Sequence, residues 1–130
     1  MSHISSIDIE IKSLDDLATA AKSLGLELKR GQTTYKWYGR TPQACDHAIV
    51  VPDQAAYEIG IKKRGDGKPG FVLEWDDFNP VMRNKVGQHG NLLKQAYARA
   101  AAIRTAQQQG FRVNEARQAD GTIRLQLTRG

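Results

Sequence analysis

Alternation of apolar and polar residues constrains the fold of this chain more than any other feature of its sequence. In HISSIDIEI, Ile7, Ile9 and Ile11 share one side, and Asp8 and Glu10 share the other. This period of two is typical of a strand with one buried face. The alternation returns in YEIGIKKR and FVLEW around GDGKPG, and in FRVNEAR and TIRLQLTR around QADG. Each of these pairs predicts a β-hairpin, because turn residues separate two strand patterns.

Two other segments have the period of a helix. Ser13 opens SLDDLATAAKSLG, and Gly25 is expected to end that helix. Asn91 is expected to cap NLLKQAYARAAAIRTAQQQG, which Gly110 would end. Their apolar stripes are Leu14, Leu17, Ala21 and Leu24 in the first helix, and Leu93, Ala96, Tyr97, Ala100 and Ile103 in the second. LELK and HAIVVP are interpreted as further strands, and residues 31–45 and 76–90 as loops.

The order of these elements is β-α-β, loop, β-β-β, loop, α-β-β. It predicts an α+β fold: a mostly antiparallel sheet of about seven strands with two helices packed on one face. The 130 residues are enough for a single α+β domain spanning 1–130. The start lacks the basic and apolar regions of a signal peptide, and no apolar run reaches the ~18 residues of a membrane span. A single cysteine demands no oxidising compartment, so we expect a cytoplasmic protein without membrane contact.

Charge is distributed unevenly along the chain. Residues 1–80 hold 10 basic and 12 acidic residues (−2), and residues 81–130 hold 9 and 2 (+7), which gives the net charge of +5. A basic C-terminal third can attract phosphates or an acidic partner. Nucleic-acid binding is therefore one alternative function, carried by Lys94, Arg99, Arg104, Arg112 and Arg124. The first three are five residues apart, which spreads them around a helix, and no nucleic-acid-binding motif is present. A solvated helix face is an equally simple interpretation.

The segment YKWYGR interleaves aromatic and basic residues within a polar loop. Aromatic residues and Arg are enriched at protein interfaces, and aromatic residues beside bases also serve as stacking platforms for single strands. We expect this loop and a nearby acidic segment to contact a protein partner through Tyr35, Lys36, Trp37, Tyr38, Arg40, Asp76, Asp77 and Phe78. The alternative is that these aromatic side chains fold the long loop onto the sheet.

A third hypothesis is an enzyme or metal protein. Cys45 and His47 could share one face where a loop enters a strand, and Glu74 and Asp76 could share another. A buried cysteine and carboxylates that end a strand are the simpler interpretations. The remaining histidines, His3 and His89, show no ligand spacing, and no phosphate-binding loop, dinucleotide fingerprint or zincin helix is present. We therefore expect no catalytic residues, metal or cofactor.

Several short sequence segments, spread along nearly the whole chain, match those of a known family in the same order. They are MSHISSI, YGR, CDHAIVVP followed by YEIGI, LEWD, LLKQAYA and QGFRVNEARQADGTIRLQL. In these segments the chain resembles the hypothetical chloroplast reading frame thirty-five family, a domain of unknown function in algal plastids and cyanobacteria with relatives in bacteria and phage. The resemblance implies a small intracellular protein without an established activity, and supplies no catalytic residues. Genes of that family often lie near one for an AAA-type ATPase, which suggests an accessory or adaptor role. The leading hypothesis is a non-enzymatic binding protein that recognises a protein partner.

Overall fold

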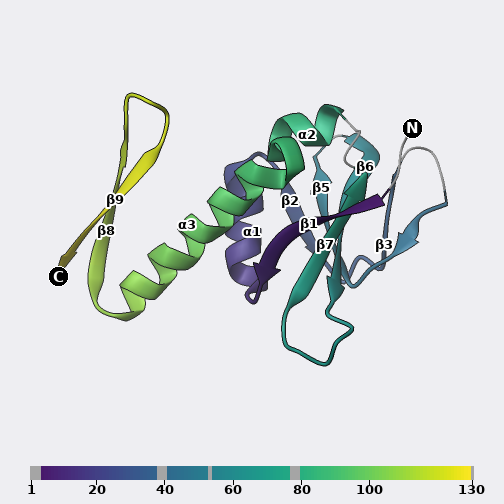
Figure 1. Cartoon of the computed structure of the whole chain (residues 1–130), viewed down its shortest axis with the longest axis horizontal. Coiled ribbons are helices and arrows are strands. Elements are labelled where there is room, and N and C mark those ends of the chain that lie inside the picture. The colour runs from purple at the N-terminus through teal and green to yellow at the C-terminus, as the bar shows by residue number, and fades with distance from the viewer. Residues whose placement is uncertain (1–3, 38–40, 53, 77–79, 130) are drawn as a thin grey trace.

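The computed structural model describes residues 4–37, 41–52, 54–76 and 80–129. Each helix or strand is identified in Figure 1 by the label used below. The elements, in chain order, are β1 (Ile4–Ile11), α1 (Leu14–Ser23), β2 (Glu27–Arg30), β3 (Thr34–Tyr35), β4 (Gln43–Ala44), β5 (His47–Val51), β6 (Gln54–Lys63), β7 (Phe71–Asp76), α2 (Pro80–Val86), a 3₁₀ turn (Gln88–Gly90), α3 (Asn91–Gln108), β8 (Phe111–Arg117) and β9 (Ile123–Arg129).

The main sheet has five strands in the order β1-β7-β6-β5-β2. Every neighbouring pair in it is antiparallel. The two edge strands of the sheet are β1 and β2. These observations confirm the α+β class and the mostly antiparallel sheet predicted from the alternating strand patterns.

One face of this sheet carries the hydrophobic core. Ile61 is opposite Leu73, and Leu73 is opposite Ile7, so their side chains form one row across three strands. All three are buried in the same cluster as Leu17 of α1 and Leu93 of α3. Burying a side chain of this size contributes about 1.5–3 kcal/mol, so this shared row fixes both helices on one side of the sheet.

The first helix begins as its sequence predicts. The Ser13 hydroxyl accepts the Asp16 N–H at 3.1 Å, and Gly25 follows the helix end with φ of +75°. The second long helix begins differently, because Asn91 lies in its first turn and Gly90 takes the cap position with φ of +74°. A side chain at Gly90 would place its Cβ 2.8 Å from Cγ2 of Ile7, so the close approach to β1 requires glycine there.

Two segments expected to be loops contain regular structure. Pro80 begins α2, a position that suits its fixed φ and missing N–H. Met82 and Val86 stand one helical turn apart and are both buried in the core. Within residues 31–45, β3 and β4 form a short antiparallel pair.

The C-terminal hairpin is the largest departure from the expected arrangement. Its turn is confirmed: Gly121 has φ of +87°, and the Asp120 carboxylate accepts the Thr122 N–H at 3.0 Å. However, β8 and β9 form a separate two-stranded sheet beyond the end of α3, so the main sheet has five strands where about seven were expected (Figure 1). In the part of the chain described here, no helix combines the length and apolar character that crossing a membrane requires.

Candidate functional site

Tyr35 fastens the β3–β4 pair onto the sheet face opposite the core. Its side chain is fully buried, and its hydroxyl donates to Oε2 of Glu74 at 3.1 Å. The ring lies against Gly60, where an added Cβ would stand 2.2 Å from the ring carbon Cδ1. Burial, together with the charge of Glu74, raises the pKa of the Tyr35 phenol above its usual range. Oε1 of Glu74 is also 3.2 Å from Nζ of Lys62, so these three side chains form one polar group on the sheet.

The buried carboxylate of Glu58 holds the chain on both sides of Tyr35. Glu58 accepts the backbone N–H of Lys36 at 2.9 Å and the Gln32 amide at 3.1 Å. Trp37 is half-buried, and its indole N–H donates to the Thr41 carbonyl at 3.1 Å. The start of this loop therefore has a defined conformation, held by two partly buried hydrogen bonds to Glu58 and an exposed one from Trp37.

Fewer residues are available for the expected partner surface than the sequence predicts. Tyr35 and Asp76 are buried at 0% and 3% exposure, so they support the fold around them and present almost no surface. Lys36 is exposed and Trp37 is half-exposed, so both can still contact a partner. Tyr38, Arg40, Asp77 and Phe78 lie outside the described residues. The use of this loop as a contact surface remains a prediction.

Cys45 has the environment of a structural thiol. Its S–H donates to the Gln32 carbonyl at 3.2 Å, and burial raises its pKa above the ordinary value. A nucleophilic cysteine needs the opposite shift, toward the thiolate.

His47 and Asp46 are likewise engaged with the backbone. Nδ1 of His47 accepts the Gly31 N–H at 3.0 Å, and its ring lies edge-on to Phe71. Asp46 accepts the Lys63 N–H at 2.8 Å. Across residues 4–37, 41–52, 54–76 and 80–129, no three His, Cys, Asp or Glu side chains gather closely enough to hold a metal ion. The geometry therefore gives the enzyme or metal hypothesis no observation to build on.

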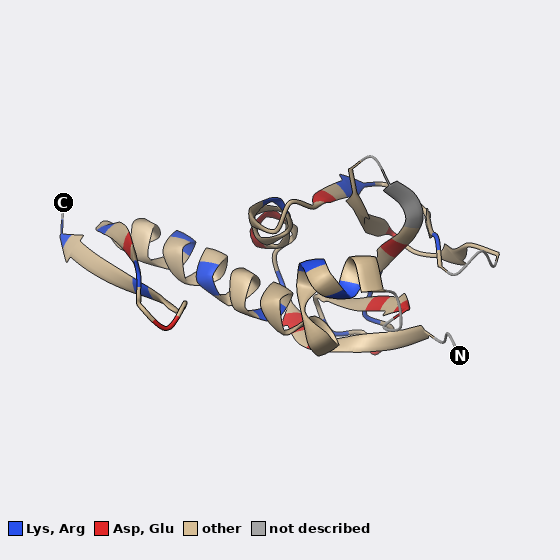
Figure 2. Cartoon of the chain, turned by 90° about the horizontal axis from the view of Figure 1, so that it is seen from above, with Lys and Arg blue, Asp and Glu red and all other residues tan. Residues whose placement is uncertain are grey.

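The basic residues of the C-terminal third do not gather into one patch. Figure 2 shows Lys and Arg at several levels along α3. Arg104 makes two parallel hydrogen bonds to the Asp16 carboxylate, and Arg99 lies 3.8 Å from Glu115. Arg112 and Arg124 are exposed on one face of the hairpin. Two of the five expected nucleic-acid contacts are thus already paired within the chain.

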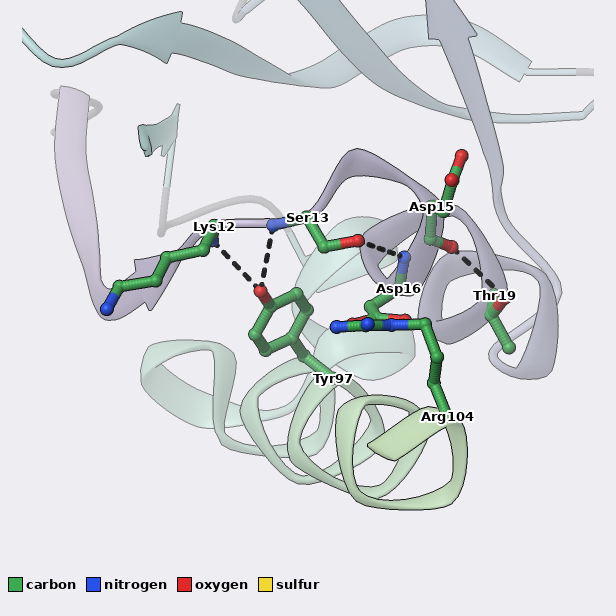
Figure 3. Close-up of polar contacts among 7 residues, drawn as sticks. All are labelled: Lys12, Ser13, Asp15, Asp16, Thr19, Tyr97 and Arg104. Carbon is green, nitrogen blue, oxygen red and sulfur yellow. Dashed lines mark hydrogen bonds and ion pairs between the residues drawn. The ribbon is translucent and has the colours of Figure 1, made fainter. Parts of the chain in front are cut away.

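A polar junction between β1, α1 and α3 was missed by the sequence interpretation. The Tyr97 hydroxyl oxygen accepts the backbone N–H groups of Lys12 and Ser13 at 2.9 and 3.2 Å (Figure 3). Beside it, Arg104 holds the buried Asp16 at 2.9 Å. Tyr97 is in the apolar stripe of α3 and Asp16 is in the first turn of α1, but their partners are more than 80 residues away in sequence. Contacts between residues so far apart in the sequence produce no local sequence pattern that could predict them.

A cleft of about 520 Å³ opens next to this junction. Lys12, Arg30 and Arg104 line it, which at first suggests an anion site. Each base is paired, however: Lys12 with Glu10, Arg30 with Asp15 and Arg104 with Asp16. The charges around the cleft therefore nearly cancel, and the cleft has no positive electrostatic potential that would favour an anion.

The C-terminal hairpin has one largely apolar face. Opposite pairs on that face are Phe111 with Arg129, Val113 with Leu127, Glu115 with Leu125, and Arg117 with Ile123. The Arg129 guanidinium lies 4.9 Å from the centre of the Phe111 ring, where its alkyl stem and charge cover that end. The other face carries polar and charged residues, among them Arg112 and Arg124. We call β8 and β9 together the hairpin arm.

This apolar face is only partly covered. Glu115 lies 3.8 Å from Arg99 in the middle of α3, so the face is turned toward that helix. Its apolar side chains stay half-exposed, and Leu127 reaches 50% exposure. None of them belongs to the main core cluster. A lone two-stranded hairpin is marginal in water, so such a face gains stability from a further packing partner. The hairpin arm is the best candidate functional site in the described part of the chain.

Comparison with known proteins gives a family but no relative of known activity. A search of curated proteins and a search of solved structures each returned no significant match. A family model described as "Protein of unknown function" (DUF1257) matches residues 20–126. The match begins within α1 and ends within β9, so it includes most of the hairpin arm. The chain therefore belongs to this DUF1257 family of proteins of unknown function.

Proposed function

We propose that this protein is a non-enzymatic accessory protein that binds other protein chains through its hairpin arm. The observation that carries the proposal is the half-exposed apolar face of β8 and β9, held beyond the end of α3. In Figure 2, which is turned by 90° from Figure 1, the hairpin lies beside the last part of α3, away from the main sheet. Exposed apolar surface on a projecting element is typical of a docking site.

The residues that surround the apolar face support the same function. Arg117 and Arg129 share that face with the aliphatic side chains, so a basic rim adjoins the apolar centre. An apolar centre with a polar rim is the usual anatomy of a protein interface. Clusters that could hold a metal are missing from the described residues, and burial raises the pKa of the Cys45 thiol, which disfavours the thiolate that a nucleophile needs.

The test compares two faces of the same strand. Leu125→Asn with Leu127→Asn makes the apolar face polar, whereas Gln126→Asn with Thr128→Asn changes two residues of the opposite face. We expect the first variant to lose association with the proteins that wild type binds, by at least about tenfold, because central apolar contacts carry most interface energy. The readout is quantitative pull-down with mass spectrometry, together with sedimentation of the purified chain.

The second variant is the matched control and is expected to retain these associations. Thermal melts of both variants show whether the body stays folded. Equal recovery of every associated protein by both variants would contradict the proposal.

We also propose a cellular setting and a first partner to test. The short sequence segments that match in order along the chain support assignment to the hypothetical chloroplast reading frame thirty-five family and an accessory role in the cytoplasm. An AAA-type ATPase is then the first named partner to examine, by adding the purified ATPase to immobilised protein. The segment YKWYGR, which contains Trp37, is a second surface to test in that experiment, because Lys36 is exposed and Trp37 is half-exposed. Unchanged recovery with Trp37→Ala would exclude that loop from the contact.

Nucleic-acid binding is the second candidate, and the exposed Arg112 and Arg124 favour it. Binding through such residues releases counterions, so affinity would fall steeply with salt. A gel shift with DNA and RNA at low salt measures this, and no retention would exclude the candidate.

A further inference from the structure

We propose that the hairpin arm of one copy adds to the β1 edge of a second copy, so that the two chains share one extended sheet. This inference rests on the proposed function, because it names the surface that the arm binds. The added hairpin would extend the five-stranded main sheet to seven strands. That number agrees with the alternating patterns in the sequence, which predict about seven strands in one sheet.

The receiving element is the edge strand β1. It pairs with β7 on one side and is the last strand of the sheet. A groove of about 390 Å³ spans β1 and its partner β7, where their register shifts between Ile7 and Ile11, and its lining includes Ile9, Phe71, Asp8 and Glu10. An unpaired strand edge accepts a further strand through backbone hydrogen bonds. The unpaired side of β1 therefore offers a site for a strand with one apolar side.

The strand β9 fits this edge by its alternation. Ile123, Leu125 and Leu127 stand two residues apart, as the isoleucines of β1 do. In a sheet, alternate residues of neighbouring strands share a face. With β9 beside β1, its aliphatic side chains would continue the core face, where Ile9 is only half-buried and Leu127 is half-exposed.

The charges of the two elements are complementary. Asp8 and Glu10 are exposed on β1, and Arg112 and Arg124 are exposed on the polar face of the hairpin arm. Opposite charges on neighbouring strands favour pairing, which applies to Arg124 on β9, whereas Arg112 on β8 would lie one strand further from β1. Arg64 also lines the groove but is held by Asp66 at 2.6 Å. Glu10 is already paired with Lys12 at 3.3 Å, so Asp8 supplies most of the negative charge that the arm would meet.

The same charges select the body of the second copy over its arm. Residues 81–130 have a net charge of +7, and residues 1–80 have −2. Two arms packed face to face would bring like charges together, which disfavours that arrangement. The basic arm on the acidic edge of another copy is the electrostatically favoured pairing.

The test uses two oppositely changed forms of the full chain. The first form carries Asp8→Lys and Glu10→Lys, and the second carries Arg112→Glu and Arg124→Glu. Each form alone places like charges at the interface, and we expect its self-association to weaken at least about tenfold. When the two forms are mixed, each arm meets an edge of opposite charge, so mixed dimers or larger mixed assemblies should form. Sedimentation velocity and native mass spectrometry count the copies and identify the mixture.

Lys85→Glu is the matched control, because it changes an exposed base outside both elements. It should self-associate as wild type does. Self-association of wild type with no loss in either changed form, or no recovery on mixing, would overturn the shared-sheet arrangement.

Failure of this inference can be distinguished from failure of the proposed function. A wild-type chain that stays monomeric, but whose capture of another protein is lost in the Leu125→Asn and Leu127→Asn variant, overturns the inference and leaves the function standing. A monomeric chain for which that variant also captures every partner as wild type does overturns both. Melting temperatures of all forms confirm that a loss of association is not a loss of fold.

Discussion

Gly60 is the residue on which the attachment of the β3–β4 pair depends. Its backbone passes directly beneath the Tyr35 ring, and its φ is not in the left-handed region, so space alone excludes a side chain. Tyr35 in turn is anchored by Glu74, and its neighbour Lys36 by Glu58. A missing methyl group thus allows an aromatic ring to close one face of the sheet.

We expect Gly60→Ala to lower the free energy of unfolding by about 1–3 kcal/mol, the usual cost of overpacking. The new Cβ would stand 2.2 Å from the Tyr35 ring, so the ring must move. Urea denaturation measures the change. Gly65→Ala is the control, because its added Cβ would meet no atom within 4 Å. Adding Tyr35→Ala to Gly60→Ala should cost less than the sum of the two single changes, and strict additivity would contradict the contact.

Alkaline pH should destabilise the protein through Tyr35 and Cys45. Burial raises the pKa of both groups in the folded chain, whereas in the unfolded chain they ionise near about 10 and about 8.5. The folded state then binds more protons above those values, so their contribution is intact below about pH 8.5 and is lost as pH rises. Urea denaturation from neutral to alkaline pH should show a shallower fall for Tyr35→Phe than for wild type. Tyr57→Phe is the control, and parallel curves for Tyr35→Phe and wild type would refute the assignment.

At the scale of the elements, the hairpin arm is separate from the core. None of residues 111–129 belongs to the core cluster, and the arm contacts the rest of the described chain mainly through α3. Elements of this kind open locally at low cost.

We therefore expect a chain ending at Gln109 to unfold cooperatively, with a melting temperature close to that of the full chain. Differential scanning calorimetry measures the temperature, and circular dichroism shows whether the sheet and helices persist. Loss of the cooperative transition would show that the arm packs on the body. In the full chain, amide hydrogens of β8 and β9 should exchange faster than those of β6.

The elements that the sequence predicts correctly are those with a long, regular pattern. The alternation of Ile7, Ile9 and Ile11 and the stripe from Leu93 to Ile103 each identify an element without further help. The helix α2 was missed because seven residues with only Met82 and Val86 inward give a weak period, although Pro80 was a start signal. The position of the hairpin arm could not be predicted, because alternation shows which face is apolar but not what covers it. The junction of Asp16, Tyr97 and Arg104 depends on contacts distant in sequence and left no pattern.

The whole molecule is elongated, with the hairpin arm at one end and the main sheet toward the other (Figure 1). A compact chain of this length has a radius of gyration of about 14 Å. We expect small-angle X-ray scattering of the monomer at low concentration to give a clearly larger value. Truncation at Gln109 should bring it toward the compact value, and a full-length monomer near about 14 Å would show that the arm folds back.

The rigid helix that carries the arm has a consequence for how the arm can vary. With 18 residues, α3 spans roughly 27 Å, and its last turns are fastened to α1 where Arg104 meets Asp16. One residue inserted after Arg104 would lengthen the reach by only about 1.5 Å but would swing the aliphatic side of the hairpin by about 100° around the helix axis. The rotation of the hairpin about the axis of α3 is therefore constrained more strictly than the length of the helix. Insertions or deletions that keep the direction of the aliphatic face would have to add or remove whole helical turns.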